Sequence, residues 1–144
     1  MNTVKDLVRF LKKKKVDFSE SSLSIRKRLR KSKFRFLGQG CYKSAYVHKK
    51  FPEFVVKVNK YTGWDRDCLG VMKLPKKLRK FYLRPAFQKG RIVIQRRCDT
   101  KNGNSVKAEI QIQKNFRYDI GRYDVSDYNT GFVGDKPVFF DFCL

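Results

Sequence analysis

The chain has 144 residues, of which 35 are Lys or Arg and 13 are Asp or Glu, so its formal net charge is +22. Hydrophobic residues make up 41% of the chain and aromatic residues 15%, a composition that excludes an intrinsically disordered protein and allows one sizeable core. Because so high a positive charge attracts polyanions, we expect an acidic protein surface, nucleic acid or an anionic membrane surface as the partner.

Cysteine and hydropathy patterns exclude several further classes. The four cysteines are dispersed without a C-x-x-C pair, and there is one histidine, so neither a zinc site nor a disulfide framework is indicated. No stretch approaches the roughly 18 consecutive apolar residues of a membrane span, and no apolar signal stretch opens the chain. We therefore expect a cytoplasmic protein without a membrane span.

The first part of the chain is predicted to be a basic helical extension, residues 1–33, followed by one domain, residues 34–144. Thr3 can cap a helix in which Val4, Leu7, Val8 and Leu11 share one apolar face. The predicted polyanion-binding residues are Lys12, Lys13, Lys14, Lys15, Arg26, Lys27, Arg28 and Arg30. A solvated helix edge with no partner explains these charges equally well.

Strand patterns begin at Phe34. The aromatic and β-branched segments 34–37, 45–48 and 54–58 predict a three-stranded antiparallel meander with a glycine turn at Gly38 and Gly40. Lys57 lies among valines in the third segment, where a charge is costly to bury unless it meets an anion. Taken singly, a solvated lysine on an edge strand and an ordinary glycine turn are the commoner structures.

Helix and hairpin signals follow Lys57. We expect Ser105 to cap a helix that buries Val106 and Ile110, together with Phe116. The other expected elements are a short helix at 63–73, a helix at 75–81 that Pro75 opens, a hairpin of 83–88 with 91–95, and a hairpin of 130–133 with 137–140.

The last hairpin carries Asn129 at its entry and Asp141 at its exit. Amide and carboxylate oxygens are the hard ligands that Mg²⁺ prefers, and the two ends of a hairpin lie close enough to share a cation. Asp124, a few residues before Asn129, can present its carboxylate to a hydroxyl nucleophile. For any one of these residues, capping a turn is the commoner role.

In this order and spacing the residues resemble the protein-kinase superfamily, and in particular the early serine/threonine kinases of tailed enterobacterial bacteriophages. The resemblance implies an α+β, minimal protein-kinase-like fold, with an antiparallel N-lobe sheet and helices and a reduced C-terminal part that ends at a metal-binding hairpin. The segments that carry it are Leu37-Gly38-Gln39-Gly40, Ser44-Ala45-Tyr46-Val47-His48, Val55-Val56-Lys57-Val58, Tyr123-Asp124, Asn129 and Asp141.

The same resemblance implies a role for each site residue. Gly38 and Gly40 would cover the phosphates of ATP, and Lys57 would contact the α and β phosphates. Asp124 would be the catalytic base, and the implied ligands of Mg²⁺ are Asn129 and Asp141.

The chain also departs from the kinase pattern. Lys43 stands where a third loop glycine is usual, Arg122 where a histidine precedes the catalytic residue, and Cys143 where a glycine follows Asp-Phe. Because Asp141 lies so near the last residue, we expect no activation segment and no peptide-binding helices, unless a second copy of the chain in a homodimer supplies the missing part.

The residues leave three functions open. The first is a phage-type minimal kinase that binds MgATP and phosphorylates itself or a host protein. The second is a pseudokinase, a catalytically inactive kinase-like module that inhibits a host protein during host takeover in the host cytoplasm. The third is a basic nucleic-acid-binding protein, for which the net charge of +22 is the main support.

Overall fold

A five-stranded antiparallel sheet forms the centre of the first of two units in the computed structural model, which describes residues 2–39, 43–60 and 73–140. The first unit comprises residues 1–64 and 85–97, and the second comprises residues 65–84 and 98–144. Both units contain helices and strands, so the fold is α+β, as predicted.

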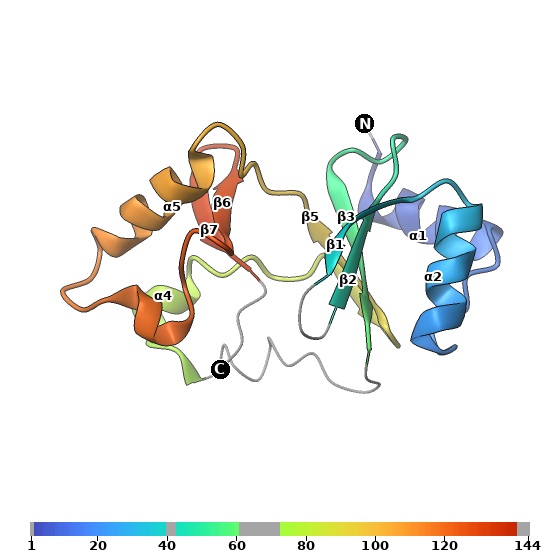
Figure 1. The fold of residues 1–144 in the computed structure, drawn as a ribbon, viewed down its shortest axis with the longest axis horizontal. Helices are drawn as coiled ribbons and strands as arrows, with labels where there is room; N and C mark the ends of the chain where they lie inside the picture. Colours follow the sequence, from blue (N-terminus) through green and yellow to red (C-terminus); the bar gives the residue numbers. More distant parts are fainter. Residues whose placement is uncertain (1, 40–42, 61–72, 141–144) are drawn as a thin grey trace. The chain divides into compact units, whose positions relative to one another are not determined.

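The strands of this sheet follow the order β1-β2-β3-β5-β4. Figure 1 shows the sheet together with α1 and α2. The predicted meander is confirmed to within two residues at each end, and the predicted second hairpin extends it, because β5 pairs with β3. The strands are β1 (Arg35–Gln39), β2 (Lys43–Val47), β3 (Phe54–Asn59), β4 (Phe87–Lys89) and β5 (Ile92–Arg96).

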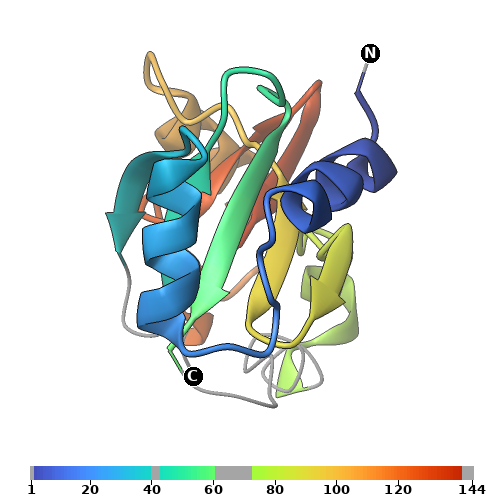
Figure 2. The same cartoon turned by 90° about the vertical axis from the view of Figure 1, so that its right-hand side faces the viewer.

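Two helices, α1 (Val4–Lys13) and α2 (Ser22–Lys31), lie on the same face of the sheet (Figure 2). Alternate residues of β3 point to this face because side chains alternate along a strand. The resulting core contains Leu7, Leu11, Ile25, Leu29, Tyr46, Phe54, Val56, Val58, Ile92 and Ile94. Residues 1–33 are thus part of the core of the first unit.

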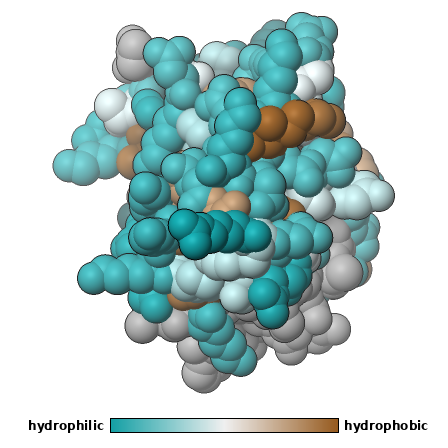
Figure 3. All heavy atoms as spheres, turned by 90° about the vertical axis from the view of Figure 1, so that its left-hand side faces the viewer, coloured by the Kyte–Doolittle hydropathy of each residue, from teal (hydrophilic) through white to brown (hydrophobic). Residues whose placement is uncertain are grey.

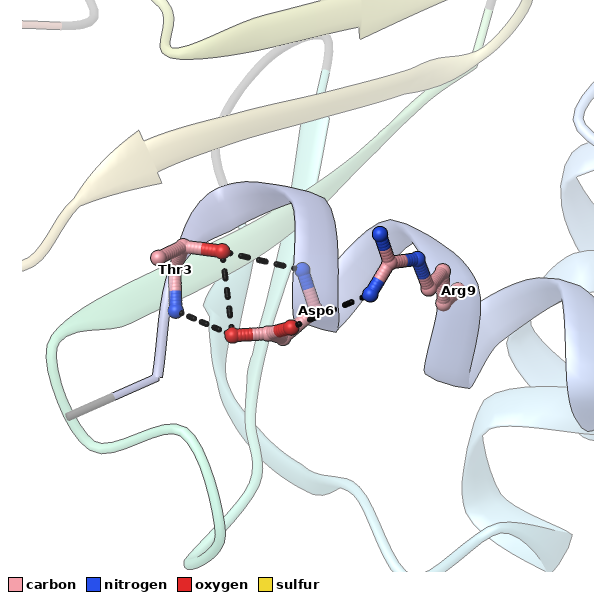
Figure 4. Close-up of polar contacts among 3 residues, drawn as sticks. All are labelled: Thr3, Asp6 and Arg9. Carbon is pink, nitrogen blue, oxygen red and sulfur yellow. Dashed lines mark hydrogen bonds and ion pairs between the residues drawn. The ribbon is translucent and has the colours of Figure 1, made fainter.

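The predicted cap of α1 is confirmed in detail. The Thr3 hydroxyl accepts a hydrogen bond from the backbone N–H of Asp6 at 3.2 Å, and the Asp6 carboxylate accepts one from the backbone N–H of Thr3 at 2.8 Å (Figure 4). Arg9 forms an ion pair with Asp6 at 3.6 Å. These contacts satisfy backbone donors that the first turn of a helix leaves without intrahelical partners.

The segment between α1 and α2 packs against the turn of the β4–β5 hairpin. The backbone N–H of Arg91 donates to the carbonyl of Phe18 at 2.8 Å. Gly90 has a φ of +58°, and a Cβ at this position would lie 2.2 Å from the Phe18 carbonyl oxygen. The turn therefore requires glycine for both its backbone conformation and its close approach.

The second unit is built from short elements. A two-stranded hairpin, β6 (Thr130–Val133) and β7 (Lys136–Phe139), accompanies α4 (Lys76–Arg79), α5 (Asn104–Gln113) and the 3-10 helix η1 (Ile120–Tyr123). The predicted hairpin and the helix after Pro75 are confirmed, whereas residues 63–72 of the other predicted helix lie outside the described residues. The core contains Leu74, Leu78, Phe81, Tyr82, Ile112, Ile120, Val125 and Phe139.

The predicted buried face of α5 is wrong at Val106 and Ile110, whereas Phe116, just after the helix, packs against the core of the second unit as predicted. Gly103, not Ser105, occupies the N-cap, and the helix buries Ala108 and Ile112.

Val106 and Ile110 are 44% and 50% exposed. Figure 3 shows a face of the molecule that is mostly hydrophilic, with a few apolar patches. Val106 and Ile110 have the i, i+4 spacing of one helix face, and so do Ala108 and Ile112. Periodicity therefore cannot tell which pair is buried. Packing on β6 and β7 selects the pair with Ala108, because its small side chain allows the helix to approach closely.

Candidate functional site

Lys57 lies in the middle of the first sheet. Its strand, β3, pairs with β2 on one side and β5 on the other, and the residue is only 5% exposed. An exposed lysine on an edge strand is therefore excluded for this position. A buried ammonium group is stabilised by a nearby anion, so the position of Lys57 suits contact with a negatively charged ligand.

Gly38 and Lys57 lie in one row across the sheet. Gly38 pairs with Ala45, which pairs with Lys57, and Lys57 pairs with Val93. Directly paired residues of adjacent strands share a face, and strands are about 4.8 Å apart, so Gly38 and Lys57 are separated by roughly 10 Å. This face is opposite the one that α1 and α2 cover.

The strand that carries Gly38 is irregular at this point. The register of β1 against β2 shifts between Phe36 and Gly38, and a Cβ built on Gly38 would meet no atom within 4 Å. Backbone without a side chain can approach a ligand closely. The other predicted loop glycine, Gly40, lies outside the described residues.

In the second unit, Asp124 and Asn129 are joined by a hydrogen bond. The Nδ2 of Asn129 donates to the backbone carbonyl of Asp124 at 2.8 Å, and its Oδ1 accepts from the backbone N–H of Ser126 at 3.0 Å. Asn129 is 6% exposed, whereas Asp124 is exposed and has a left-handed backbone with φ 61°. An amide oxygen has two lone pairs, so Oδ1 can still bind a cation.

The loop that ends at Asn129 is fixed to the hairpin and to α5. The backbone N–H of Phe140 donates to the carbonyl of Asn129 at 2.9 Å. The hydroxyl of Thr130 lies 2.7 Å from the carbonyl oxygen of Ser105 and 2.9 Å from that of Ser126. Asp141 follows Phe140 in the sequence but lies outside the described residues, and within the described ranges no group of three or more acidic, His or Cys residues could hold a metal ion.

A carboxylate that the sequence did not single out lies beside this loop. Glu109 of α5 accepts a hydrogen bond from the backbone of Asp127, but its pKa is raised, first by burial and then by repulsion from Asp127 and Asp119. Three carboxylates, those of Glu109, Asp119 and Asp127, thus act on one another in this part of a strongly basic protein. The sequence prediction placed Val106 and Ile110 on the buried face of α5, so it gave no reason to expect Glu109 beside this loop. In the structure Glu109 follows the buried Ala108.

The four described site residues form two pairs in different units. Gly38 and Lys57 belong to the first unit, and Asp124 and Asn129 belong to the second. The structure therefore brings together the residues within each pair.

The predicted polyanion-binding residues are nearly all exposed. Arg26 is the exception: it is half-buried, and its Nε donates to the hydroxyl of the buried Tyr46 at 3.0 Å, which fixes α2 on the sheet. Within the described part of the chain, none of the eight forms an ion pair with a carboxylate. The exposed ones are Lys12, Lys13, Lys14, Lys15, Lys27, Arg28 and Arg30.

Comparisons with protein-family models, with curated protein sequences and with solved structures give no match. Among the described residues, no helix has the length and apolar character to cross a membrane.

Proposed function

We propose that the chain is a kinase-like protein that binds MgATP and transfers the γ-phosphoryl group to a hydroxyl of itself or of a host protein. The observation that carries this proposal is the hydrogen bond from the Asn129 side chain to the Asp124 carbonyl, at 2.8 Å. It fixes the backbone that carries the exposed Asp124 at one end of a loop and the buried Asn129 amide at the other, next to the hairpin that precedes Asp141 in the sequence.

Each residue has one task in this proposal. The ammonium group of Lys57 contacts the α and β phosphates, and the backbone around Gly38 covers them. Asp124 orients the attacking hydroxyl, while Asn129 and Asp141 supply the oxygen ligands for Mg²⁺. The cation neutralises phosphate charge, which matters because phosphoryl transfer depends mainly on positioning and charge stabilisation.

Nucleotide binding is tested by thermal unfolding with and without MgATP. A ligand at 100 times its Kd stabilises a protein by about 2.7 kcal/mol, so the wild-type melting temperature should rise in a magnesium-dependent way. Lys57→Met preserves the volume of the buried side chain and should abolish the rise. Lys107→Met, at an exposed position of α5, is the matched control and should retain it. No rise at millimolar MgATP in the wild type would contradict the proposal.

Phosphotransfer is tested separately by labelling with γ-³²P ATP, alone and in host lysate. Asp124→Asn keeps a residue that tolerates the left-handed backbone. This variant should still bind MgATP but incorporate no label. Equal labelling of this variant and the wild type would show that Asp124 is not the base. Binding without labelling in the wild type would identify the chain as a pseudokinase.

A further inference from the structure

His48 lies at the centre of an aromatic cluster in the first unit. Its ring centroid is 4.9 Å from those of Phe10 and Phe34 and 6.1 Å from that of Phe51. Phe10 belongs to α1, Phe34 precedes β1, and Phe51 lies in the turn between β2 and β3. The cluster therefore joins segments that are distant in the sequence, and His48 itself is 8% exposed.

Three lysines surround this cluster on its outer side. The Nζ atoms of Lys14 and Lys50 each lie 5.4 Å from the centroid of the Phe10 ring, and Lys49 adjoins Lys50. Lys14 is the C-cap of α1, and the other two belong to the turn after β2. All three are exposed, and among the described residues no carboxylate pairs with any of them.

Backbone and side-chain contacts hold this turn in place. The backbone N–H of Lys50 donates to Nδ1 of His48 at 3.1 Å, and Nδ2 of Asn2 donates to the carbonyl of Lys50 at 2.6 Å. The backbone of Lys50 is thus fixed at both its N–H and its carbonyl, and the side chain is exposed.

The positive charges of the three lysines act on His48. The pKa of His48 is lowered, first by burial and then by the positive charges of Lys49, Lys50 and Lys14, against the opposing effect of a hydrogen bond with the Ser32 backbone. These are the charged groups that face His48 from α1 and from the β2–β3 turn. An anion that binds the three lysines would offset their positive charge and so raise the pKa of His48.

We propose that Lys14, Lys49 and Lys50 form a surface that binds the sugar-phosphate backbone of nucleic acid without sequence preference. Lysines on flexible stems are point charges that suit a line of phosphates. Lys12, Lys13 and Lys15 extend the positive charge beside the cluster. Nucleic acid is favoured over an acidic protein because its closely and regularly spaced phosphates carry condensed counterions, and a protein of net charge +22 releases these counterions on binding.

The test uses substitutions in the full chain, because residues 1–33 contribute Leu7, Leu11, Ile25 and Leu29 to the core and cannot be removed without unfolding. Binding of an oligothymidine is measured against salt concentration. The slope of log affinity against log salt is negative. In K14Q/K49Q/K50Q it should become shallower by about 2, since each lost phosphate contact on a single strand accounts for about 0.7.

The matched control is K101Q/K107Q/K114Q, which removes the same charge from exposed lysines of the second unit. Its slope should stay closer to that of the wild type. An equal fall in both variants would mean that binding follows net charge alone and would overturn the proposed surface.

His48 provides an independent readout because it is the only histidine. In an NMR titration of its ring protons, oligothymidine should raise the pKa of His48 in the wild type and in the control variant. In K14Q/K49Q/K50Q the pKa should already be higher and should not change further. An unchanged pKa in saturated wild-type protein would overturn the proposal, as would an equal affinity and an equal shift with polyglutamate, which would indicate an acidic protein instead.

Discussion

Gly38 and Lys57 are both cross-strand neighbours of Ala45, so that backbone lacking a side chain and a buried ammonium group share one face of the sheet. The pleat of a sheet directs the side chains of directly paired residues to the same face, so these residues are neighbours on that face. The row extends to Val93 on the next strand. This relationship leads to a prediction that separates folding from ligand binding.

Gly38→Ala should leave folding intact and weaken MgATP binding. No atom lies within 4 Å of the added Cβ, and Gly38 has no positive φ, so the free energy of unfolding should change by no more than about 1 kcal/mol. A phosphate that lies against the backbone would, however, meet the new methyl group. Urea unfolding and calorimetric titration with MgATP measure the two effects. Unchanged affinity would exclude close approach of the nucleotide at Gly38.

Asn129→Ala should destabilise the protein without nucleotide. The substitution removes two part-buried hydrogen bonds, to the carbonyl of Asp124 and from the N–H of Ser126, so the total cost should be about 1–3 kcal/mol. Urea unfolding measures the loss. The matched control is Asn115→Ala, whose exposed side chain donates to the Gln111 carbonyl at 2.9 Å and should cost less than about 0.5 kcal/mol. Equal costs would contradict the structural role of Asn129.

Gly90→Ala should be far more destabilising than Gly134→Ala. Both glycines have positive φ, +58° and +60°, so each substitution carries the cost of a left-handed backbone, about 1–2 kcal/mol. Only at Gly90 does the new Cβ collide with the carbonyl of Phe18, which accepts the hydrogen bond from Arg91. The difference between the two unfolding midpoints measures the packing of the α1–α2 segment on the hairpin, and similar midpoints would show that this segment can move aside.

Stability should fall with acid because of His48. Its pKa in the folded protein is below the unfolded value of 6.5, chiefly because of burial, so the unfolded state binds more protons below that value. The contribution is fully present above pH 6.5 and is lost as the pH falls through the window between the two values, with a slope of at most about 1.4 kcal/mol per pH unit.

The check is urea unfolding from about pH 8 to about pH 5 in the wild type and in His48→Gln, which keeps a hydrogen-bond acceptor but does not titrate in this range. The variant should show a shallower dependence on pH. Parallel curves for the two proteins would mean that other groups cause the loss of stability in acid.

The sequence alone determined the local elements. The cap at Thr3, the apolar face of α1, the strands around Lys57 and the hairpin after Asn129 were all predicted, because each depends on residues that are close together in the chain. Glycines favour turns and alternating valines favour strands through contacts within a few residues. These local preferences hold in any tertiary structure that buries one face of the strand. The order of the site residues was equally visible in the sequence.

Only the tertiary structure decided which faces are buried and which distant residues meet. Periodicity offered two apolar pairs on α5, and packing against β6 and β7 buried Ala108 and Ile112 in place of Val106 and Ile110. Lys57 became a central residue because β5 pairs beside β3 across a long stretch of intervening sequence. Likewise, Lys14 and Lys50 both lie over the Phe10 ring because Phe10 packs on His48, since burial of aromatic surface joins segments that no local pattern connects.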